Sequence, residues 1–251
     1  MSSFTKMYIG KIIDLLNRIS SEEENNFNAA AKILADAIEG NGRIFAYGCT
    51  HSATTMQDIY QRAGGLAVIN AIFIPGLEAL HAHPFGLASK LERLQGYAEI
   101  ALDCAPIRKG DVLIVVSVSG RNAIPIEFAK IAKERMIKVI AVTGLDYSKS
   151  VKPRHPDGKN MYEYADVILD NKAIAGDAIM EAKGMKQKFC PASGITSTVV
   201  LQCMVAATVE ELLARGITPP VFMAANVDGG EEFNKKMLAE NRKRIFYLKP
   251  E

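Results

Sequence analysis

The stretch Asp111-Val-Leu-Ile-Val-Val-Ser-Val-Ser-Gly-Arg-Asn122 decides the fold of this 251-residue chain. Its first half is a continuous apolar run rich in β-branched residues, which is typical of a strand buried on both faces of a parallel sheet. Its second half is a polar turn with one glycine, and the spacing of apolar residues predicts a helix directly after it, over about residues 124–135. A second strand is expected at residues 138–142. The stretch therefore predicts two parallel strands joined by a helical crossover.

The same alternation of strands and helices extends in both directions along the chain. Further strands are expected at residues 43–47, 68–74 and 166–169, and further helices at residues 53–63, 195–215 and 231–244. Strands that alternate with helices of about 12 residues form right-handed crossovers on a parallel sheet. The sequence therefore predicts an α/β fold, a three-layer αβα sandwich around a five-stranded parallel sheet.

An N-terminal helical arm, residues 1–40, is expected to precede one domain at residues 41–251. Residues 3–38 carry apolar side chains at helical spacing, and Gly40-Asn-Gly42 ends the pattern. The apolar stripe that includes Ile9 and Ile13 could pack within the chain or across a dimer interface, and the sequence leaves both arrangements open.

The composition is that of a globular protein, with 49% hydrophobic and 23% charged residues. The formal net charge of +2 is too small to hold nucleic acid or anionic lipid by charge alone. We find no charge-free run of about 18 apolar residues and no apolar signal core at the start, so neither a membrane helix nor secretion is expected. The four cysteines lack the paired spacing of zinc or redox sites. A reduced cytoplasmic protein fits best, and the disordered, fibrous, membrane and disulfide-scaffold classes are excluded.

Two polar loops follow predicted strands, at the edge where parallel α/β sheets bind ligands. They are Tyr47-Gly-Cys-Thr-His-Ser-Ala53 and Ser117-Val-Ser-Gly-Arg-Asn122. Glycine lets the backbone approach a ligand, while hydroxyls and the N–H groups of the following helix donate hydrogen bonds, so each loop suits an anion. Either loop alone could be an ordinary helix cap, but two together favour anion binding. Neither loop is a Walker or GxGxxG sequence, which disfavours a nucleoside triphosphate or a dinucleotide.

Residues 40–215, and above all the Ser-Val-Ser-Gly-Arg-Asn element, resemble the sugar isomerase (SIS) family of phosphosugar-binding domains. The segments Arg154-His-Pro-Asp-Gly158 and Pro220–Gly229 are similar to those of a subgroup labelled phosphoheptose isomerases. The resemblance implies a flavodoxin-like αβα sandwich that forms a homodimer or homotetramer. It also implies a sugar phosphate as ligand, often bound at a subunit interface, and no cofactor.

The resemblance further implies which side chains contact the phosphosugar. The hydroxyl and amide groups of the two loops are the expected contacts: Ser52, Ser117, Ser119 and Asn122. Three residues are expected to shape the loops, namely Gly48, Thr50 and Gly120, and His51 lies within the first loop. A third contact region is expected at Ser193 and Ser197, although helix capping alone would explain these hydroxyls.

The chain departs from the family pattern at one position. The catalytic glutamate about ten residues after the first-loop serine is replaced by Arg62, which cannot abstract a proton. The base must then come from the connection before the central strand, where the candidates are Glu78, His81, His83 and Glu92. The alternatives are a polar surface loop for the first three and a solvated helix face for Glu92. A metal site is not expected, because two histidines and one carboxylate at this spacing fit no standard pattern.

Residues 148–165 show little regular pattern, and long irregular loops in compact domains tend to be functional. His155, between Pro153 and Pro156, could belong to a lid that closes over the ligand or reaches a neighbouring subunit, or to a plain surface loop. Asp170 and Asp177 follow the last predicted strand and are expected near the same edge of the sheet.

The sequence thus predicts a protein that binds a small sugar phosphate, with no nucleic-acid or membrane partner. The leading hypothesis is a sugar-phosphate isomerase (aldose–ketose) or a lyase that uses a Glu/His acid–base pair. The alternative is a non-catalytic phosphosugar sensor, which the missing glutamate motivates. A purely structural role is the weakest hypothesis because it leaves both loops unexplained.

Overall fold

The computed structural model describes residues 3–78, 84 and 86–248. Its central sheet has the strand order β2-β1-β3-β4-β5, and all neighbouring strands pair in parallel. The five strands are β1 (Ile44–Gly48), β2 (Ile69–Ala71), β3 (Val112–Val116), β4 (Lys138–Thr143) and β5 (Val167–Asp170). The predicted five-stranded parallel sheet is confirmed, and the strand order is that of a flavodoxin-like fold.

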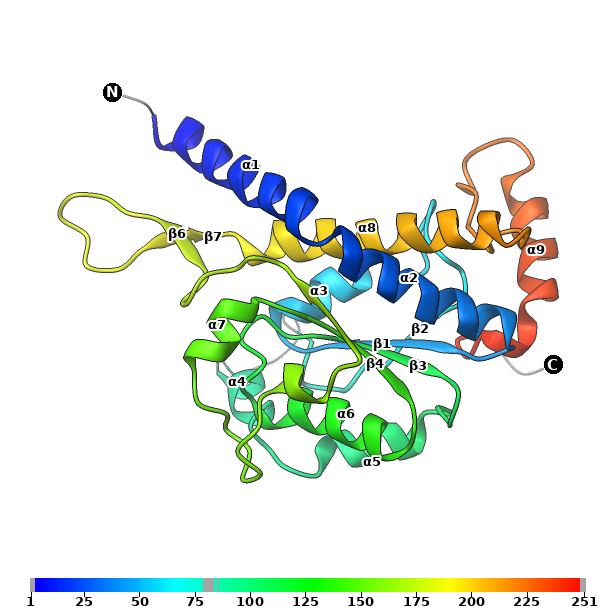
Figure 1. The fold of residues 1–251 in the computed structure, drawn as a ribbon, viewed down its shortest axis with the longest axis horizontal. Coiled ribbons are helices and arrows are strands. Elements are labelled where there is room, and N and C mark those ends of the chain that lie inside the picture. Colours follow the sequence, from blue (N-terminus) through cyan, green and yellow to red (C-terminus); the bar gives the residue numbers. More distant parts are fainter. Residues whose placement is uncertain (1–2, 79–83, 85, 249–251) are drawn as a thin grey trace.

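Helices cover both faces of the sheet, which gives the predicted three layers (Figure 1). One face packs against α2 (Glu24–Glu39), α3 (His51–Gln57) and α8 (Ser193–Ala214), and the other against α5 (Tyr97–Cys104) and α6 (Ala123–Glu134). Alternate residues of β3 enter the two cores, since side chains point to opposite faces along a strand. This explains why the whole of β3 is apolar.

The shorter elements lie between these layers or after them. They are α4 (Leu87–Leu91), α7 (Leu145–Ser150), α9 (Gly230–Glu240) and the 3₁₀ turns η1 (Met161–Tyr164) and η2 (Arg242–Arg244). The helix predicted at residues 53–63 is displaced: α3 begins at His51 and ends at Gln57. Helices α5 and α7 were not predicted, because each is too short to show a clear apolar period.

The N-terminal arm is shorter than the predicted residues 1–40. The chain bends at Glu23, between α1 (Phe4–Glu22) and α2, and α2 belongs to the sandwich because Leu34 and Ile38 are buried in its core. Only α1 projects, together with a hairpin that was not predicted, β6 (Ala178–Met180) and β7 (Phe189–Pro191) (Figure 1).

Contacts between α1 and the hairpin hold the projecting arm together. Ile12 packs against Ile179 and Met180 in a small apolar cluster. The Tyr8 hydroxyl donates a hydrogen bond to the Pro191 carbonyl oxygen at 2.7 Å. The apolar stripe on α1 is therefore divided, with one side packed within the chain and the other, at Ile9 and Ile13, exposed.

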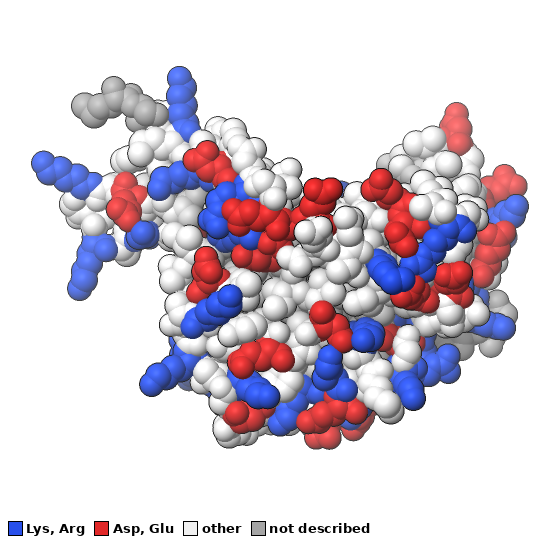
Figure 2. Space-filling model, viewed as in Figure 1, with Lys and Arg blue, Asp and Glu red and all other residues white. Residues whose placement is uncertain are grey.

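Charges of both signs are interspersed over the face drawn in Figure 2, and basic side chains project at the end formed by α1 and the hairpin. The sequence of the hairpin contains Lys183, Lys186 and Lys188. This mixed surface agrees with the net charge of +2.

By length and composition, α8 could cross a membrane, and it is the one such helix in the described part of the chain. The search of the sequence for a charge-free run of about 18 apolar residues did not single out α8, because Thr, Ser and Gln interrupt its apolar residues. Its apolar character has a structural cause: Val200, Leu201 and Met204 are completely buried in the core shared with α2.

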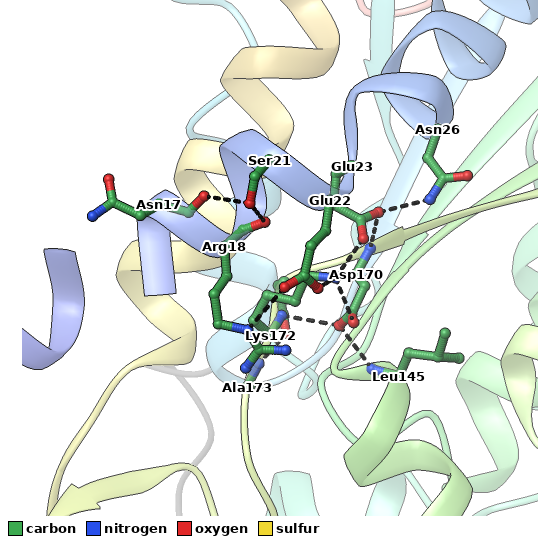
Figure 3. Close-up of polar contacts among 11 residues, drawn as sticks. Asn17, Arg18, Ser21, Glu22, Glu23, Asn26, Leu145, Asp170, Lys172 and Ala173 are labelled. Carbon is green, nitrogen blue, oxygen red and sulfur yellow. Dashed lines mark hydrogen bonds and ion pairs between the residues drawn. The ribbon is translucent and has the colours of Figure 1, made fainter. Parts of the chain in front are cut away.

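A buried cluster of charges ties the bend at Glu23 to the end of β5 (Figure 3). The Lys172 ammonium contacts Glu23 Oε1 at 2.5 Å, and Asp170 Oδ2 and Glu22 Oε2 at 3.1 Å each. The side chains of Lys172 and Glu23 are only 5% and 4% exposed. Burial disfavours the ammonium, but the three carboxylates more than offset this effect and hold the pKa of Lys172 above its usual value.

Replacing Lys172 with Met is expected to lower the free energy of unfolding by about 3–5 kcal/mol, because the buried Glu23 carboxylate loses its counter-charge. Lys32→Met is the matched control, since the Lys32–Asp36 pair is exposed, and it should change stability by less than about 0.5 kcal/mol. Urea denaturation measures both variants. Equal losses of stability in the two variants would contradict the conclusion that the buried Glu23 carboxylate depends on Lys172.

Candidate functional site

The loops after β1 and β3 border one cavity of about 260 Å³ at the carboxyl edge of the sheet. The strand order reverses between these two strands, so the helices that follow them, α3 and α6, lie on opposite faces (Figure 1). Such a reversal opens a crevice, which is the usual ligand position in open α/β sheets. The predicted residues in its walls are Thr50, His51, Ser52, Glu92, Ser117, Ser119, Asn122 and Ser193. Its other walls come from Cys49, Val118, Tyr147, Gly176 and Asp177.

The first loop is tightly folded around Gly48. A Cβ at this position would lie 2.5 Å from the Ser52 carbonyl oxygen, so only glycine fits without a shift of the backbone. Thr50 has a positive φ of 54°, which is unusual for a β-branched residue, and its N–H donates to the Leu77 carbonyl oxygen at 2.7 Å. This turn places the Ser52 hydroxyl at the cavity.

The second loop is held from three sides. The Ser117 N–H donates to the Val142 carbonyl oxygen at 3.0 Å, and the Gly120 N–H donates to Ser117 Oγ at 3.3 Å. Gly120 has a φ of 58°, and a Cβ there would lie 2.9 Å from Ser148 Oγ. Asn122 then precedes α6, whose first turn contains Pro125, and the Ile124 N–H of this turn donates to the Glu92 carbonyl oxygen at 3.2 Å.

Ser193 and Ser197 have different environments. The Ser193 hydroxyl donates to Asp177 Oδ2 at 2.6 Å, and its N–H donates to Asp177 Oδ1 at 2.8 Å, at the wall of the cavity. Ser197 is buried one turn further along α8, where its hydroxyl accepts from Asn171 Nδ2 at 2.7 Å. Ser197 is therefore outside the cavity, and Asp177 joins the third region instead.

Glu92, the residue directly after α4, directs its carboxylate into the cavity rather than toward solvent, which overturns the solvated-face alternative. The Cys49 thiol donates to Glu92 Oε2 at 3.5 Å, and Asn122 lines the same cavity. Burial raises the pKa of Glu92 above its usual value, although the Cys49 and Asn122 side chains and two arginines act in the opposite direction. Burial also raises the pKa of Cys49, so its thiol stays protonated and can donate.

Of the other candidate bases, Glu78 is not among the residues that line the cavity. Glu78 is partly buried beside the first loop, where it forms a β-bridge with Thr50. His81 and His83 lie outside the described residues. Asp170 belongs to the Lys172 cluster.

Arg62, at the position of the family's glutamate, is paired with the Asp58 carboxylate. Asp58 Oδ2 also accepts from Gln202 Nε2 at 3.0 Å, which ties the end of α3 to α8. The family pattern has a catalytic acid at this position. In this chain, Arg62 and Asp58 lie just after the end of α3 and form an ion pair there instead.

The sequence left a lid and a plain surface loop open for His155, which packs against α6 and is not among the residues that line the cavity. Its side chain is 8% exposed, with Nε2 3.6 Å from Glu127 Oε1 and Nδ1 2.7 Å from Asp157 Oδ1. The neighbouring Arg154 reaches the site, because its Nη1 donates to Asn122 Oδ1 at 2.8 Å. The sequence marked the segment that begins at Arg154 as similar to the subgroup, but no local pattern predicted its contact with Asn122, which lies 32 residues away.

A second cavity, of about 390 Å³, adjoins the first. The two share His51, Asp177 and Ser193, and the second extends between α3 and the start of α8. Its further walls are mostly hydroxyl-bearing or acidic: Thr54, Thr55, Asp58, Pro191, Gly194 and Thr198. Among the residues that the structure describes, no group of three or more His, Cys, Asp or Glu side chains could hold a metal ion.

A family model described as the SIS domain matches residues 7–144 of the chain. Among curated proteins, a UPF0309 protein from Streptomyces griseus is 41% identical over 246 residues, which cover 98% of both chains. A UPF0309 protein from Oceanobacillus iheyensis is 39% identical over 98% of this chain and 100% of its own length. The resemblance to the SIS family stated from the sequence is thus confirmed over residues 7–144, and the UPF0309 relatives match nearly the whole chain.

Two solved structures have the same fold. The phosphoheptose isomerase from Neisseria gonorrhoeae superimposes with a TM-score of 0.54 at 18% identity, covering 82% of this chain and 97% of its own. A phosphoheptose isomerase from Francisella tularensis gives 0.52 at 16% identity, covering 84% of this chain and 100% of its own. At these identities the similarity concerns the fold alone.

Gly48→Ala is expected to destabilise the chain by about 1–3 kcal/mol, because the new methyl group must displace the backbone at Ser52. Gly10→Ala is the matched control, since a Cβ on the α1 helix at Gly10 meets nothing within 4 Å and alanine favours a helix. Thermal unfolding of the two variants should move in opposite directions. An unchanged Gly48→Ala variant would show that the first loop is not tightly constrained.

Proposed function

We propose that this chain, which belongs to the SIS domain family and to the UPF0309 proteins, binds a sugar phosphate between the β1 and β3 loops. The observation that carries the proposal is the convergence of two loops rich in hydroxyl groups on one cavity at the reversal of strand order. The fold shared with proteins named phosphoheptose isomerases supports this class of ligand.

The phosphate would lie among the hydroxyls of Ser52, Ser117 and Ser119. Within the described chain, the Ser52 and Ser119 hydroxyls have no hydrogen-bond partner, so both can donate to a phosphate oxygen. The positive end of the α6 dipole lies at the same edge of the sheet and favours an anion there. A dianion can thus be held without a lysine or arginine in the cavity wall.

The carbon chain of the sugar would extend into the adjoining cavity. The shared residues His51, Asp177 and Ser193 make the two cavities continuous. Most of the surface that its walls expose is apolar, and the Thr55 and Thr198 hydroxyls donate to backbone carbonyl oxygens, so the carbon chain would meet mainly apolar contacts there.

Glu92 is the proposed base of an isomerase or lyase. Aldose–ketose isomerisation takes a proton from the carbon beside a carbonyl group and returns it to the neighbouring carbon, and elimination begins with the same abstraction. A carboxylate whose pKa is raised by burial is a stronger base than an exposed one. His51, on another wall of the same cavity, is the proposed partner that moves the hydroxyl proton.

One observation favours the alternative function, a phosphosugar sensor without turnover. Arg62 and Asp58 form an ion pair at the end of α3, so no free acid stands at the position of the family's glutamate. A chain that binds a sugar phosphate and converts none would have this function.

Replacing both Ser117 and Ser119 with alanine is expected to weaken sugar-phosphate binding about 100-fold. A hydrogen bond to a charged group contributes about 1.5–3 kcal/mol, and about 1.4 kcal/mol corresponds to a factor of ten in affinity. Titration calorimetry with hexose, heptose and amino-sugar phosphates measures the loss. Ser119→Ala alone checks that the effect does not come from the Ser117–Gly120 contact, and Ser21→Ala on α1 is the control. Unchanged affinity for every phosphate that binds would overturn the proposed cradle.

Glu92→Gln is expected to keep the affinity for sugar phosphate and to lower kcat by about 10²–10⁴, because the amide cannot accept a proton. In the unmodified protein, kcat should rise with pH through the raised pKa of Glu92, since only the ionised carboxylate acts as a base. Glu99→Gln, on the exposed side of α5, is the control. Normal turnover by Glu92→Gln would remove Glu92 from this role, and binding without turnover by the unmodified protein would favour the sensor.

A further inference from the structure

Asp177 and Ser193 are in contact at the boundary of the two cavities, and both residues belong to the walls of each. The Ser193 hydroxyl donates to Asp177 Oδ2 at 2.6 Å, a distance typical of a hydroxyl bound to a carboxylate. The Ser193 and Ala192 N–H groups donate to Asp177 Oδ1 at 2.8 and 3.2 Å. The Asp177 carboxylate is therefore held by three donors at the start of α8.

These contacts decide the hydrogen-bond polarity of this wall. A serine hydroxyl has one proton to donate, and Asp177 already accepts the proton of Ser193. Ser193 Oγ can therefore only accept a hydrogen bond from a further group in the cavity. An ionised carboxylate also accepts without donating. The two side chains thus differ from the Ser52 and Ser119 hydroxyls across the cavity, which are free to donate.

Asp177 also occupies the position where α8 would favour an anion. A helix N-terminus carries a partial positive charge, which stabilises a carboxylate in the same way as a phosphate. Because Asp177 accepts from the Ala192 and Ser193 N–H groups, a phosphate at this end of α8 would meet a fixed negative charge. This wall of the cavity is therefore suited to an uncharged part of the ligand.

We propose that Asp177 and Ser193 determine specificity: they accept hydrogen bonds from a hydroxyl group of the sugar and select a phosphorylated polyol or sugar over an alkyl phosphate of the same length. The inference rests on the proposed binding of the phosphate by the β1 and β3 loops. It gives the ligand a direction, with the phosphate at these loops and a hydroxyl group at the start of α8. Since most of the surface exposed by the second cavity is apolar, this contact would carry much of the selection for hydroxyl groups.

The backbone at Asp177 makes a conservative variant possible. Asp177 has a positive φ of 64°, a conformation that Asp and Asn tolerate better than other residues with a side chain. In Asp177→Asn the amide oxygen can still accept from the two N–H groups of α8. The amide nitrogen is then left beside Ser193 Oγ, where it donates and frees the Ser193 proton for the cavity. The substitution therefore keeps the shape of the wall and reverses its hydrogen-bond polarity.

The test compares sorbitol 6-phosphate, hexyl phosphate and inorganic phosphate by titration calorimetry. The first two probes have the same phosphate group and length of carbon chain and differ in their hydroxyl groups. Asp177→Asn is expected to weaken binding of sorbitol 6-phosphate about 10-fold, because a charged acceptor is lost. Hexyl phosphate and inorganic phosphate should bind with unchanged or higher affinity, because the variant removes a negative charge from the cavity wall.

Ser193→Ala separates the two possible roles of this hydroxyl. The variant removes the acceptor Oγ and keeps the backbone contact with Asp177 Oδ1. We expect it to weaken sorbitol 6-phosphate about 3-fold and to leave the other two probes unchanged. If the Ser193 hydroxyl donated to the phosphate, all three probes would bind more weakly, and the proposal would be wrong.

Asp14→Asn, on the exposed face of α1, is the control for the loss of one negative charge and should change no affinity. Thermal unfolding checks that each variant is folded. An unchanged ratio of the affinities for sorbitol 6-phosphate and hexyl phosphate in Asp177→Asn would overturn the inference, and so would equal weakening of all three probes. Failure of the proposed function gives a different pattern: no probe would bind, or binding would not depend on Ser117 and Ser119, and the inference would then fall with it.

Discussion

The reversal of strand order between β1 and β3 is the constraint on which the site depends. Crossovers on a parallel sheet are right-handed, so a chain that leaves β1 in one direction and β3 in the other must place α3 and α6 on opposite faces. The two polar loops are then left side by side above the sheet, with an opening between them. Neither loop could form the cavity alone, because each supplies only one wall.

The pairing of β1 with β3 between two cores makes this opening rigid. Each residue of β1 pairs with a residue of β3, and their side chains alternate between two separate cores, so a slip by one residue would exchange both cores. The loops inherit this precision because they begin at the last paired residues, Gly48 and Val116. Such fixed geometry allows hydroxyl groups to bind an anion without reorganising at the moment of binding.

The parts of the structure that could be predicted are those with local signals. The apolar run of β3 and the polar residues Ser117 to Asn122 are adjacent in sequence, so both the strand and its loop were predictable. The position of Glu92 at the cavity could not be predicted, because this residue follows a helix of five residues, which is too short to show which side is buried. The role of His155 was left open between a lid and a surface loop because its segment lacks a regular pattern, whereas the structure shows that non-local side-chain contacts hold this segment. The Arg154–Asn122 contact spans 32 residues and leaves no local pattern.

The placement of the arginines has a physical rationale within the proposed function. A phosphate dianion in the cavity would raise the pKa of Glu92 further, since like charges disfavour ionisation. Any such increase leaves a smaller fraction of the base ionised at a given pH. Arg93 and Arg154 are not among the described residues that line the cavity, and their charges lower the pKa of Glu92. The loops proposed to bind the phosphate are uncharged, and the two arginines that favour the ionised form of Glu92 lie elsewhere. This separation would let one small cavity hold a dianion and an ionised carboxylate together.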